Sequence, residues 1–268
     1  MDKLSISKRK LWRKKFSTYF ILLFLYMFDT IIHGVKTMTS EEFINECKKR
    51  NISISPEMLD QFIVYADLLK EWNSKMNLTA IDERDEVFEK HFFDSILPLN
   101  DSIQGKVADV GTGAGFPGIV WKIVRKDLDV SLIEPTGKRC KFLEEVISQL
   151  KLENIHVYNE RSEEHVKQHR EEYDVVTARA VANLRVLSEL CCPLVKKDGI
   201  FLTMKGSHGD DEVLEAKNAI DKLGMKLTNR EETSLTNGDP RQIFTFTKIK
   251  KTPMMYPRNY GQIKKKPL

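Results

Sequence analysis

The spacing of apolar residues changes near residue 100, from a helical period to short apolar runs typical of strands. Between residues 38 and 100 apolar side chains recur every three or four positions, which predicts three helices. Thr39 or Ser40 is expected to cap the first helix, and Ser55-Pro56 to open the second as N-cap and first helical residue. This part of the chain is therefore predicted to be a small helical subdomain.

From Lys106 onward, short apolar runs alternate with helical segments. The runs predict seven strands, at 106–110, 129–134, 155–159, 173–178, 199–204, 225–235 and 241–248. Such alternation implies a parallel sheet covered by helices on both faces. The last two runs are separated by Asn237-Gly-Asp-Pro240 and can form a hairpin. The predicted fold class is thus α/β, with a mostly parallel seven-stranded sheet over residues 101–248.

Beyond Lys248 no regular element is expected. Residues 249–268 are predicted to form an extended basic tail, because turn-forming residues interrupt every pattern: Pro253, Pro257, Gly261 and Pro267.

The charge of the chain is unevenly distributed. The formal net charge is +4, with 31% charged and 41% hydrophobic residues, a composition typical of a soluble globular protein. Residues 1–37 hold eight Lys/Arg against two acids, and residues 248–268 hold seven Lys/Arg and no acid. The segment 38–247 is left with 28 bases and 37 acids, a net charge of −9. An acidic body with basic ends suggests an enzyme whose termini attract a polyanion.

The four cysteines carry no chemistry that their spacing reveals. Cys47, Cys140, Cys191 and Cys192 form no C-x-x-C and have no histidine at ligand spacing, so neither a disulfide framework nor a metal site is expected. The adjacent Cys191 and Cys192 lie in an apolar stretch and are interpreted as small buried hydrophobic residues. The cysteine pattern agrees with a reducing, cytoplasmic location.

Residues 1–37 are interpreted as a non-native or dispensable extension. A basic segment, Lys8–Lys15, precedes an apolar run, Phe16–Phe28, in the outline of a signal peptide or short anchor. The run has 13 residues, fewer than the about 20 that a spanning helix needs, and no small-residue cleavage site follows. Met38 looks like a natural start, so no stable membrane association is expected, although a short anchor remains the alternative.

The glycine-rich segment Val107–Gly118 indicates a nucleotide-type βαβ unit, with Glu134 at the end of the next strand. Its spacing fits two cofactors. Gly111, Gly113 and Gly115 give G-x-G-x-G, the form found in S-adenosylmethionine sites, whereas counting from Gly113 to Gly118 gives the dinucleotide form G-x-G-x-x-G. Seven strands with a terminal hairpin favour a class I (Rossmann-like) methyltransferase. An NAD-dependent oxidoreductase would need a substrate domain that the chain has no room for.

The chain also resembles the small-subunit ribosomal RNA guanine-N7 methyltransferase G family, also called glucose-inhibited division protein B. The matching segments are Trp72–Thr79, His91–Ser95, Asp109–Gly118, Gly137–Arg139 with Phe142-Leu143, Ala178–Ala180 and Lys205-Gly206. The resemblance implies an S-adenosylmethionine-dependent enzyme that methylates N7 of a guanine in 16S ribosomal RNA or the small ribosomal subunit, and a monomer is expected. A non-catalytic RNA-binding or ribosome assembly protein with the same fold is the alternative.

The cofactor site is expected on the glycines and at two further strand ends. Glu134 can accept hydrogen bonds from ribose hydroxyls, or it can cap the helix that begins after Pro135. The resemblance implies cofactor contacts for Gly111 and Phe116, and for Ser162 with Glu163 on the adenine side; Ser162-Glu163 would otherwise be an ordinary N-cap.

The substrate side is expected to involve Arg179, His91, Asn77 and Lys205. Arg179 and Lys205 each end a strand, where ligands of open α/β sheets bind. Arg179 suits contact with the cofactor or with RNA phosphate, and Lys205 suits contact with phosphate or a base. His91 lies in an apolar helix and could equally be a core histidine. No general base is needed, because guanine N7 carries a free lone pair. Catalysis is then mostly alignment and charge stabilisation.

Overall fold

The computed structural model describes residues 37–179 and 182–268, and the chain divides into two units, Met1–Thr37 and Met38–Leu268. The expectation for residues 1–37, including the apolar run Phe16–Phe28, falls outside the described residues. Within the described part of the chain, no helix is long and apolar enough to cross a membrane.

Helices precede the sheet, as the apolar spacing predicts. They are α2 (Ser40–Lys49), α3 (Pro56–Met76), α4 (Arg84–Val87), the π-helical η1 (Phe88–Phe93) and α5 (Asp94–Ile96). Thr39 caps α2 in a capping box with Glu42, and the Ser55 hydroxyl caps α3 ahead of Pro56. Both predicted helix starts are confirmed. The aromatic residues of these helices pack edge-to-face, for example Phe43 on Phe62 with ring centroids 5.1 Å apart.

The sheet has seven strands in the order β3-β2-β1-β4-β5-β7-β6. Their bounds are β1 (Lys106–Val110), β2 (Asp129–Ile133), β3 (Ile155–Tyr158), β4 (Tyr173–Arg179), β5 (Val195–Lys205), β6 (Met225–Ser234) and β7 (Pro240–Lys248). The first five strands are parallel, and β7 pairs antiparallel with both β5 and β6. The predicted sheet and its terminal hairpin are confirmed. β5 starts earlier than expected, with a register shift between Tyr173 and Val175 of its partner β4.

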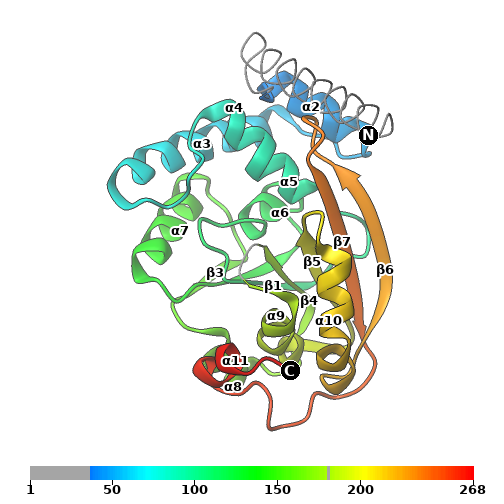
Figure 1. The fold of residues 1–268 in the computed structure, drawn as a ribbon. Coiled ribbons are helices and arrows are strands. Elements are labelled where there is room, and N and C mark those ends of the chain that lie inside the picture. The colour runs from blue at the N-terminus through cyan, green and yellow to red at the C-terminus, as the bar shows by residue number, and fades with distance from the viewer. Residues whose placement is uncertain (1–36, 180–181) are drawn as a thin grey trace, which may run out of the picture. The chain divides into compact units, whose positions relative to one another are not determined.

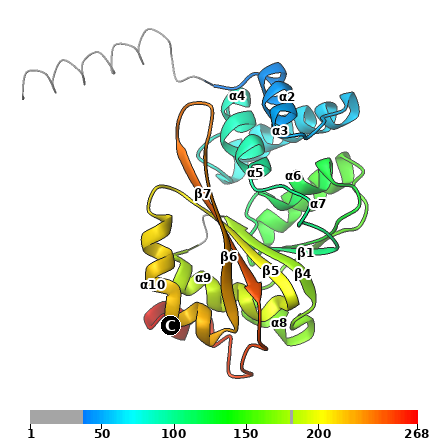
Figure 2. The same cartoon turned by 90° about the vertical axis from the view of Figure 1, so that its right-hand side faces the viewer.

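Helices cover both faces of the sheet (Figures 1 and 2). On one face, α6 (Gly118–Val124) and α7 (Gly137–Gln149) share a single apolar core with the helices that precede the sheet. On the other face, a second core joins α8 (Ser162–His169), α9 (Leu184–Cys191) and α10 (Gly209–Lys222). The four cysteines are buried free thiols, and the burial expected for Cys191 and Cys192 is confirmed.

The prediction of an extended C-terminal tail is wrong. Asn259 caps a short helix, α11 (Tyr260–Lys265), in which Ile263 is fully buried in the core around α9. The Arg258 guanidinium binds the carboxylate of Glu189, which is also fully buried, and Lys248 donates to the Cys192 carbonyl from a buried position. The Ile263 side chain and the Arg258–Glu189 ion pair are among the contacts that dock this segment, and the proline pattern could not show them.

Candidate active site

The carboxyl ends of β1, β2, β4 and β5 bring most of the predicted residues to one edge of the sheet, as the parallel pairing requires. The glycine loop follows β1, Glu134 follows β2, and Arg179 and Lys205 end β4 and β5. α4, η1 and α5 of the helical subdomain supply the remaining groups, including His91.

Two of the glycines in the loop, Gly113 and Gly115, differ in the space around them. Gly111, Gly113 and Gly115 all have a positive φ, of 66°, 63° and 96°. A Cβ on Gly115 would lie 2.6 Å from both the Tyr65 hydroxyl and the Ile119 side chain, so this glycine permits close packing. A Cβ on Gly113 would have the Gly111 oxygen, at 4.0 Å, as its nearest neighbour. The loop therefore lets a ligand approach the backbone at Gly113.

Glu134 joins the glycine loop to the next helix. Its side chain is buried, with Oε2 accepting a hydrogen bond from the Gly113 N–H at 3.0 Å and Oε1 accepting one from the Thr136 N–H at 2.9 Å. Thr136 is the N-cap of α7, so the capping interpretation describes part of its role. Each carboxylate oxygen can accept more than one hydrogen bond, which leaves capacity for ribose hydroxyls.

Asp109 also holds the glycine loop through hydrogen bonds, and it was not predicted as a site residue. Its Oδ2 accepts from the Thr112 hydroxyl at 2.6 Å and from the Gly118 N–H at 2.8 Å, whereas Oδ1 is buried with no partner in the described structure. Complete burial raises the pKa of this carboxyl to about 6. An acid near the end of a strand, two positions before the first glycine, was the signal that could have identified it.

Phe116 contacts every other member of a cluster of aromatic and cationic side chains. The His91 ring stacks on Phe116 with centroids 4.5 Å apart, and the Arg179 guanidinium carbon lies 5.0 Å from the same ring centroid. Tyr65 stacks against Phe116 at 5.5 Å and donates a hydrogen bond to the Ala114 carbonyl. Phe116, His91 and Arg179 thus form one contiguous group beside the glycine loop.

The hydrogen bonds of His91 define its protonation. Arg179 Nη2 lies 3.4 Å from His91 Nδ1, and because a guanidinium only donates, Nδ1 must be the acceptor. The proton is then on Nε2, which lies 2.9 Å from the Thr79 hydroxyl oxygen. Burial, reinforced by the charge of Arg179, lowers the pKa of His91 to about 3. His91 is therefore neutral, and its basic nitrogen is occupied by Arg179.

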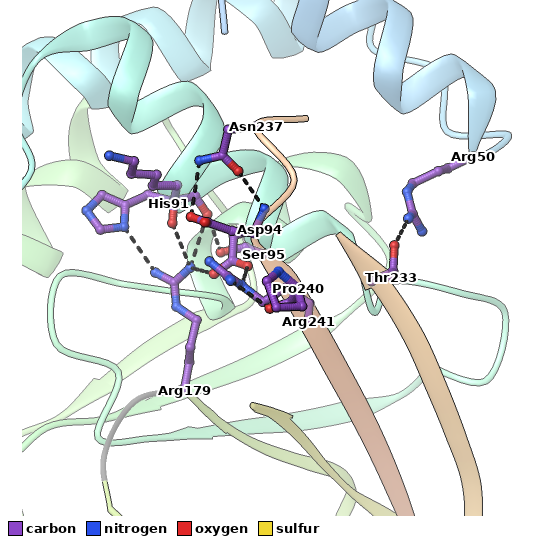
Figure 3. Close-up of polar contacts among 11 residues, drawn as sticks. Arg50, His91, Asp94, Ser95, Arg179, Thr233, Asn237, Pro240 and Arg241 are labelled. Atoms are coloured by element: carbon purple, nitrogen blue, oxygen red, sulfur yellow. Dashed lines mark hydrogen bonds and ion pairs between the residues drawn. The ribbon is translucent and has the colours of Figure 1, made fainter. Parts of the chain in front are cut away.

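A pocket of about 590 Å³ opens beside this cluster. Its lining contains four cations from different elements, namely Lys90, Arg179, Lys205 and Arg241. The acids Asp94 and Glu212 also line it, and Glu212 binds the Lys205 ammonium at 2.8 Å. Figure 3 shows Arg179, Asp94 and Arg241 converging on this region from β4, α5 and β7. Asp94, Glu212 and Arg241 were not predicted. Asp94 lies in the family-like segment His91–Ser95, so a signal for it was present in the sequence. Arg241 reaches the pocket only because of the topology of the β6–β7 hairpin.

Three further predicted residues are not among those that line the pocket. Asn77 is exposed at the end of α3 with a φ of 50°, and it is not among the residues that line the pocket. The neighbouring Asn73 instead orders the following loop, accepting from the Thr79 N–H at 2.9 Å. Ser162 is buried and donates its hydroxyl to the Leu190 carbonyl at 2.6 Å, so that side chain serves the packing of α8 on α9. Glu163 beside it is half-buried.

A seven-stranded sheet of this order, with a glycine loop after β1 and an acid after β2, defines an S-adenosylmethionine-dependent class I methyltransferase. Comparison with known proteins identifies the family. The family model described as rRNA small subunit methyltransferase G matches residues 58–240, and the chain belongs to this family.

Similar proteins include the Ribosomal RNA small subunit methyltransferase G of Streptococcus gordonii, which is 44% identical over 237 residues. The protein of the same name from Streptococcus pneumoniae is 43% identical over 239 residues. Each match covers 86% of this chain and 100% of the relative. Among solved structures, a Pyrococcus horikoshii protein described as a transferase is 15% identical, with a TM-score of 0.45 over 73% of this chain and 64% of that one.

Proposed function

We propose that this protein transfers the methyl group of S-adenosylmethionine to N7 of a guanine in 16S ribosomal RNA. Its relatives are named ribosomal RNA small subunit methyltransferases. The observation that carries the proposal is the pocket with four lining cations, one of which, Arg179, lies over the ring of Phe116 beside the glycine loop. Such a pocket suits a polyanionic substrate held next to the cofactor.

The residues of the glycine edge fit the cofactor. Gly113 leaves room for a ligand against the backbone, and the buried carboxylate of Glu134 has acceptor capacity for ribose hydroxyls. Glu163 and the backbone at Ser162 would contribute on the adenine side, since the Ser162 hydroxyl is already bonded. When bound, S-adenosylmethionine supplies an electrophilic methyl group on a cationic sulfonium.

The substrate side needs cations and alignment, and it needs no base. Guanine N7 carries a lone pair and no proton, so methylation requires no proton acceptor. This agrees with a neutral His91 whose free nitrogen accepts from Arg179. Arg179, Lys205 and Arg241 would bind phosphate oxygens and orient the target nucleotide, with Asn77 contacting RNA outside the pocket.

The test is mass spectrometry of nucleosides from RNA incubated with purified protein and S-adenosylmethionine. Naked 16S ribosomal RNA and assembled small subunits are compared as substrates. New 7-methylguanosine is expected in at least one of them. Methyl groups found only on other atoms, or tight NAD binding without S-adenosylmethionine binding in calorimetry, would contradict the proposal.

We further propose that the enzyme acts as a monomer in the cytoplasm. The four cysteines are buried free thiols, which suits a reducing compartment. Light scattering after size exclusion should give the mass of one chain; a stable dimer would contradict the first part of this proposal.

A further inference from the structure

Asp94 joins three parts of the fold at the rim of the pocket. It begins α5, and its side chain is 9% exposed. Oδ2 accepts a hydrogen bond from Arg179 Nη1 at the end of β4, at 2.9 Å, and Oδ1 accepts one from Arg241 Nε on β7, at 2.6 Å (Figure 3). One carboxylate therefore holds two guanidinium groups that come from sequence positions far from its own.

Asp94 is the strong partner of Arg179. The other contacts of this guanidinium are long: the carbonyl oxygens of Lys90 and His91 and the Nδ1 of His91 each lie at 3.4 Å. Among the residues that the structure describes, Asp94 is also the one acid that forms an ion pair with Arg179. Without Asp94, only weak contacts and the Phe116 ring would determine where the guanidinium points.

The negative charge of Asp94 balances the positive charge of two arginines at the pocket. The Arg179 side chain is 12% exposed and shares the pocket with Lys90, Lys205 and Arg241. Lys90 and Lys205 have their own acidic partners, Glu86 and Glu212. A guanidinium this well buried is costly to leave without a counter-charge. Asp94 supplies it for both arginines.

We propose that Asp94 is a positioning residue, which holds the Arg179 guanidinium across the Phe116 ring so that it faces the substrate. Arg241 fixes the second oxygen of Asp94 and so lets the hairpin stabilise the arrangement. This inference rests on the proposed function, because it assigns Arg179 to the substrate or cofactor of that site.

A purely structural role is the competing explanation, since Asp94 links the hairpin to the helices. The structure separates the two explanations, because the hairpin has other links. Arg50 Nη2 donates to the Thr233 hydroxyl at 2.5 Å (Figure 3). The Thr236 hydroxyl donates to Glu89 Oε1 at 2.6 Å. Thr236→Val therefore loosens the hairpin without touching Arg179, and it is a matched control.

The experiment is a double-mutant cycle with Asp94→Asn and Arg179→Gln. Wild type, both single variants, the double variant and Thr236→Val are compared by kcat/KM for small-subunit RNA methylation and by urea unfolding. Asp94→Asn is expected to lower kcat/KM about 10- to 100-fold, the range for a hydrogen bond between charged groups. If Asp94 acts through Arg179, adding Asp94→Asn to Arg179→Gln should cost less than threefold more. Thr236→Val should stay within about threefold of wild type.

Unfolding gives a readout that does not need activity. Asp94→Asn leaves a buried guanidinium unpaired, and the double variant removes that group, so the double variant should be at least as stable as Asp94→Asn. This holds even if Asp94→Asn does not fold, since the double variant should then recover a folded protein. Independent, multiplying losses in kcat/KM, or a double variant less stable than Asp94→Asn, would overturn the inference. Absence of methylation by wild type would instead remove the proposed function.

Discussion

Glu134 accepts a hydrogen bond of 3.0 Å from the backbone N–H of Gly113, across the ends of two neighbouring parallel strands. The other carboxylate oxygen is bonded to the N-cap of α7. The residue expected to bind ribose thus also fixes the loop that the cofactor would contact. Substitution at Glu134 should therefore affect cofactor binding through both contacts.

Glu134→Gln is expected to weaken S-adenosylmethionine binding about 10- to 100-fold. The substitution removes the negative charge and replaces one acceptor by a donor, which then faces a backbone N–H. Isothermal titration with S-adenosylmethionine and S-adenosylhomocysteine measures the loss. Glu144→Gln, at an exposed position on α7, is the control and should bind as wild type does. Wild-type affinity in Glu134→Gln would show that the ribose lies elsewhere.

Gly113→Ala and Gly115→Ala should separate ligand binding from folding. At Gly113 the added Cβ meets open space, so the expected cost is the backbone strain of a positive φ, roughly 1–2 kcal/mol. At Gly115 the Cβ also collides with Tyr65 and Ile119, so unfolding should be easier by roughly 2–5 kcal/mol.

Cofactor titration of the folded variants completes this comparison. Gly113→Ala should lower S-adenosylmethionine affinity more than tenfold while the protein stays folded, because its Cβ occupies space that the ligand needs. The assignment of Gly113 to the cofactor site would be contradicted if Gly113→Ala bound S-adenosylmethionine with wild-type affinity and lost as much stability as Gly115→Ala.

The sequence predicted the parts of the site that depend on local pattern. Apolar runs located β1 and β2, and parallel pairing then required the glycine loop and Glu134 to meet. The Asp94–Arg241 contact could not be predicted in this way, since 147 positions separate the two residues and only the hairpin brings them together. The helix α11 was missed for a related reason. Its stability depends on Tyr260 and Ile263 meeting the core around α9, and two apolar residues are too few to show a periodic pattern.

His91 should make folding stability depend on pH. Its pKa in the folded protein, about 3, is below the ordinary value of 6.5, because burial and Arg179 disfavour the charged form. The unfolded chain therefore binds the proton first as the pH falls, and stability present above pH 6.5 is lost between pH 6.5 and 3. The loss is about 1.4 kcal/mol per pH unit once the pH is well below 6.5, or roughly 2 kcal/mol by pH 5.

His91→Asn tests this dependence by urea unfolding at pH 5 and pH 7. Asparagine can present an oxygen near the place of Nδ1, and it does not titrate, so the difference in stability between the two pH values should shrink. Asp109 acts with the opposite sign between its ordinary value of 3.8 and about 6, but it is present in both proteins and cancels. Partial methylation by a folded His91→Asn is expected, since no base is required. An unchanged pH dependence would contradict the neutral buried histidine.

Residues 1–37 are predicted to be dispensable for activity. Met38 is buried, and Thr39 completes a capping box at the start of α2, so the folded unit has a well-formed beginning at this point. Expression of residues 38–268 should yield soluble protein with wild-type kcat/KM. Membrane fractionation of the full chain, lost when residues 16–28 are deleted, would instead demonstrate an anchor.

The C-terminal segment is predicted to attract RNA through its exposed lysines. Two of its bases are engaged inside the protein, Lys248 with the Cys192 carbonyl and Arg258 with the buried Glu189. Five lysines remain exposed: Lys250, Lys251, Lys264, Lys265 and Lys266. Deleting the whole segment would leave Glu189 unpaired and destabilise the protein by roughly 3–5 kcal/mol, so deletion cannot isolate the effect of charge.

Replacing the five lysines with glutamine changes the charge and keeps α11 docked through Arg258 and Ile263. Residues 38–247 carry a net charge of −9 and should repel RNA, so these lysines are expected to provide much of the sequence-independent attraction. For single-stranded contacts, the slope of log affinity against log salt is about −0.7 per neutralised phosphate. With about three or four such contacts, the variant should show a slope smaller in magnitude by roughly 2 to 3.

The control replaces five exposed lysines elsewhere with glutamine, namely Lys126, Lys151, Lys167, Lys217 and Lys222. It removes the same charge, so any effect of net charge alone would appear in both variants. RNA binding across a salt series compares the three proteins, and S-adenosylmethionine affinity should be equal in all of them, because none of these lysines lies at the glycine edge. Parallel lines for wild type and the C-terminal variant would mean that these lysines do not contact phosphate, and that their charge only aids solubility.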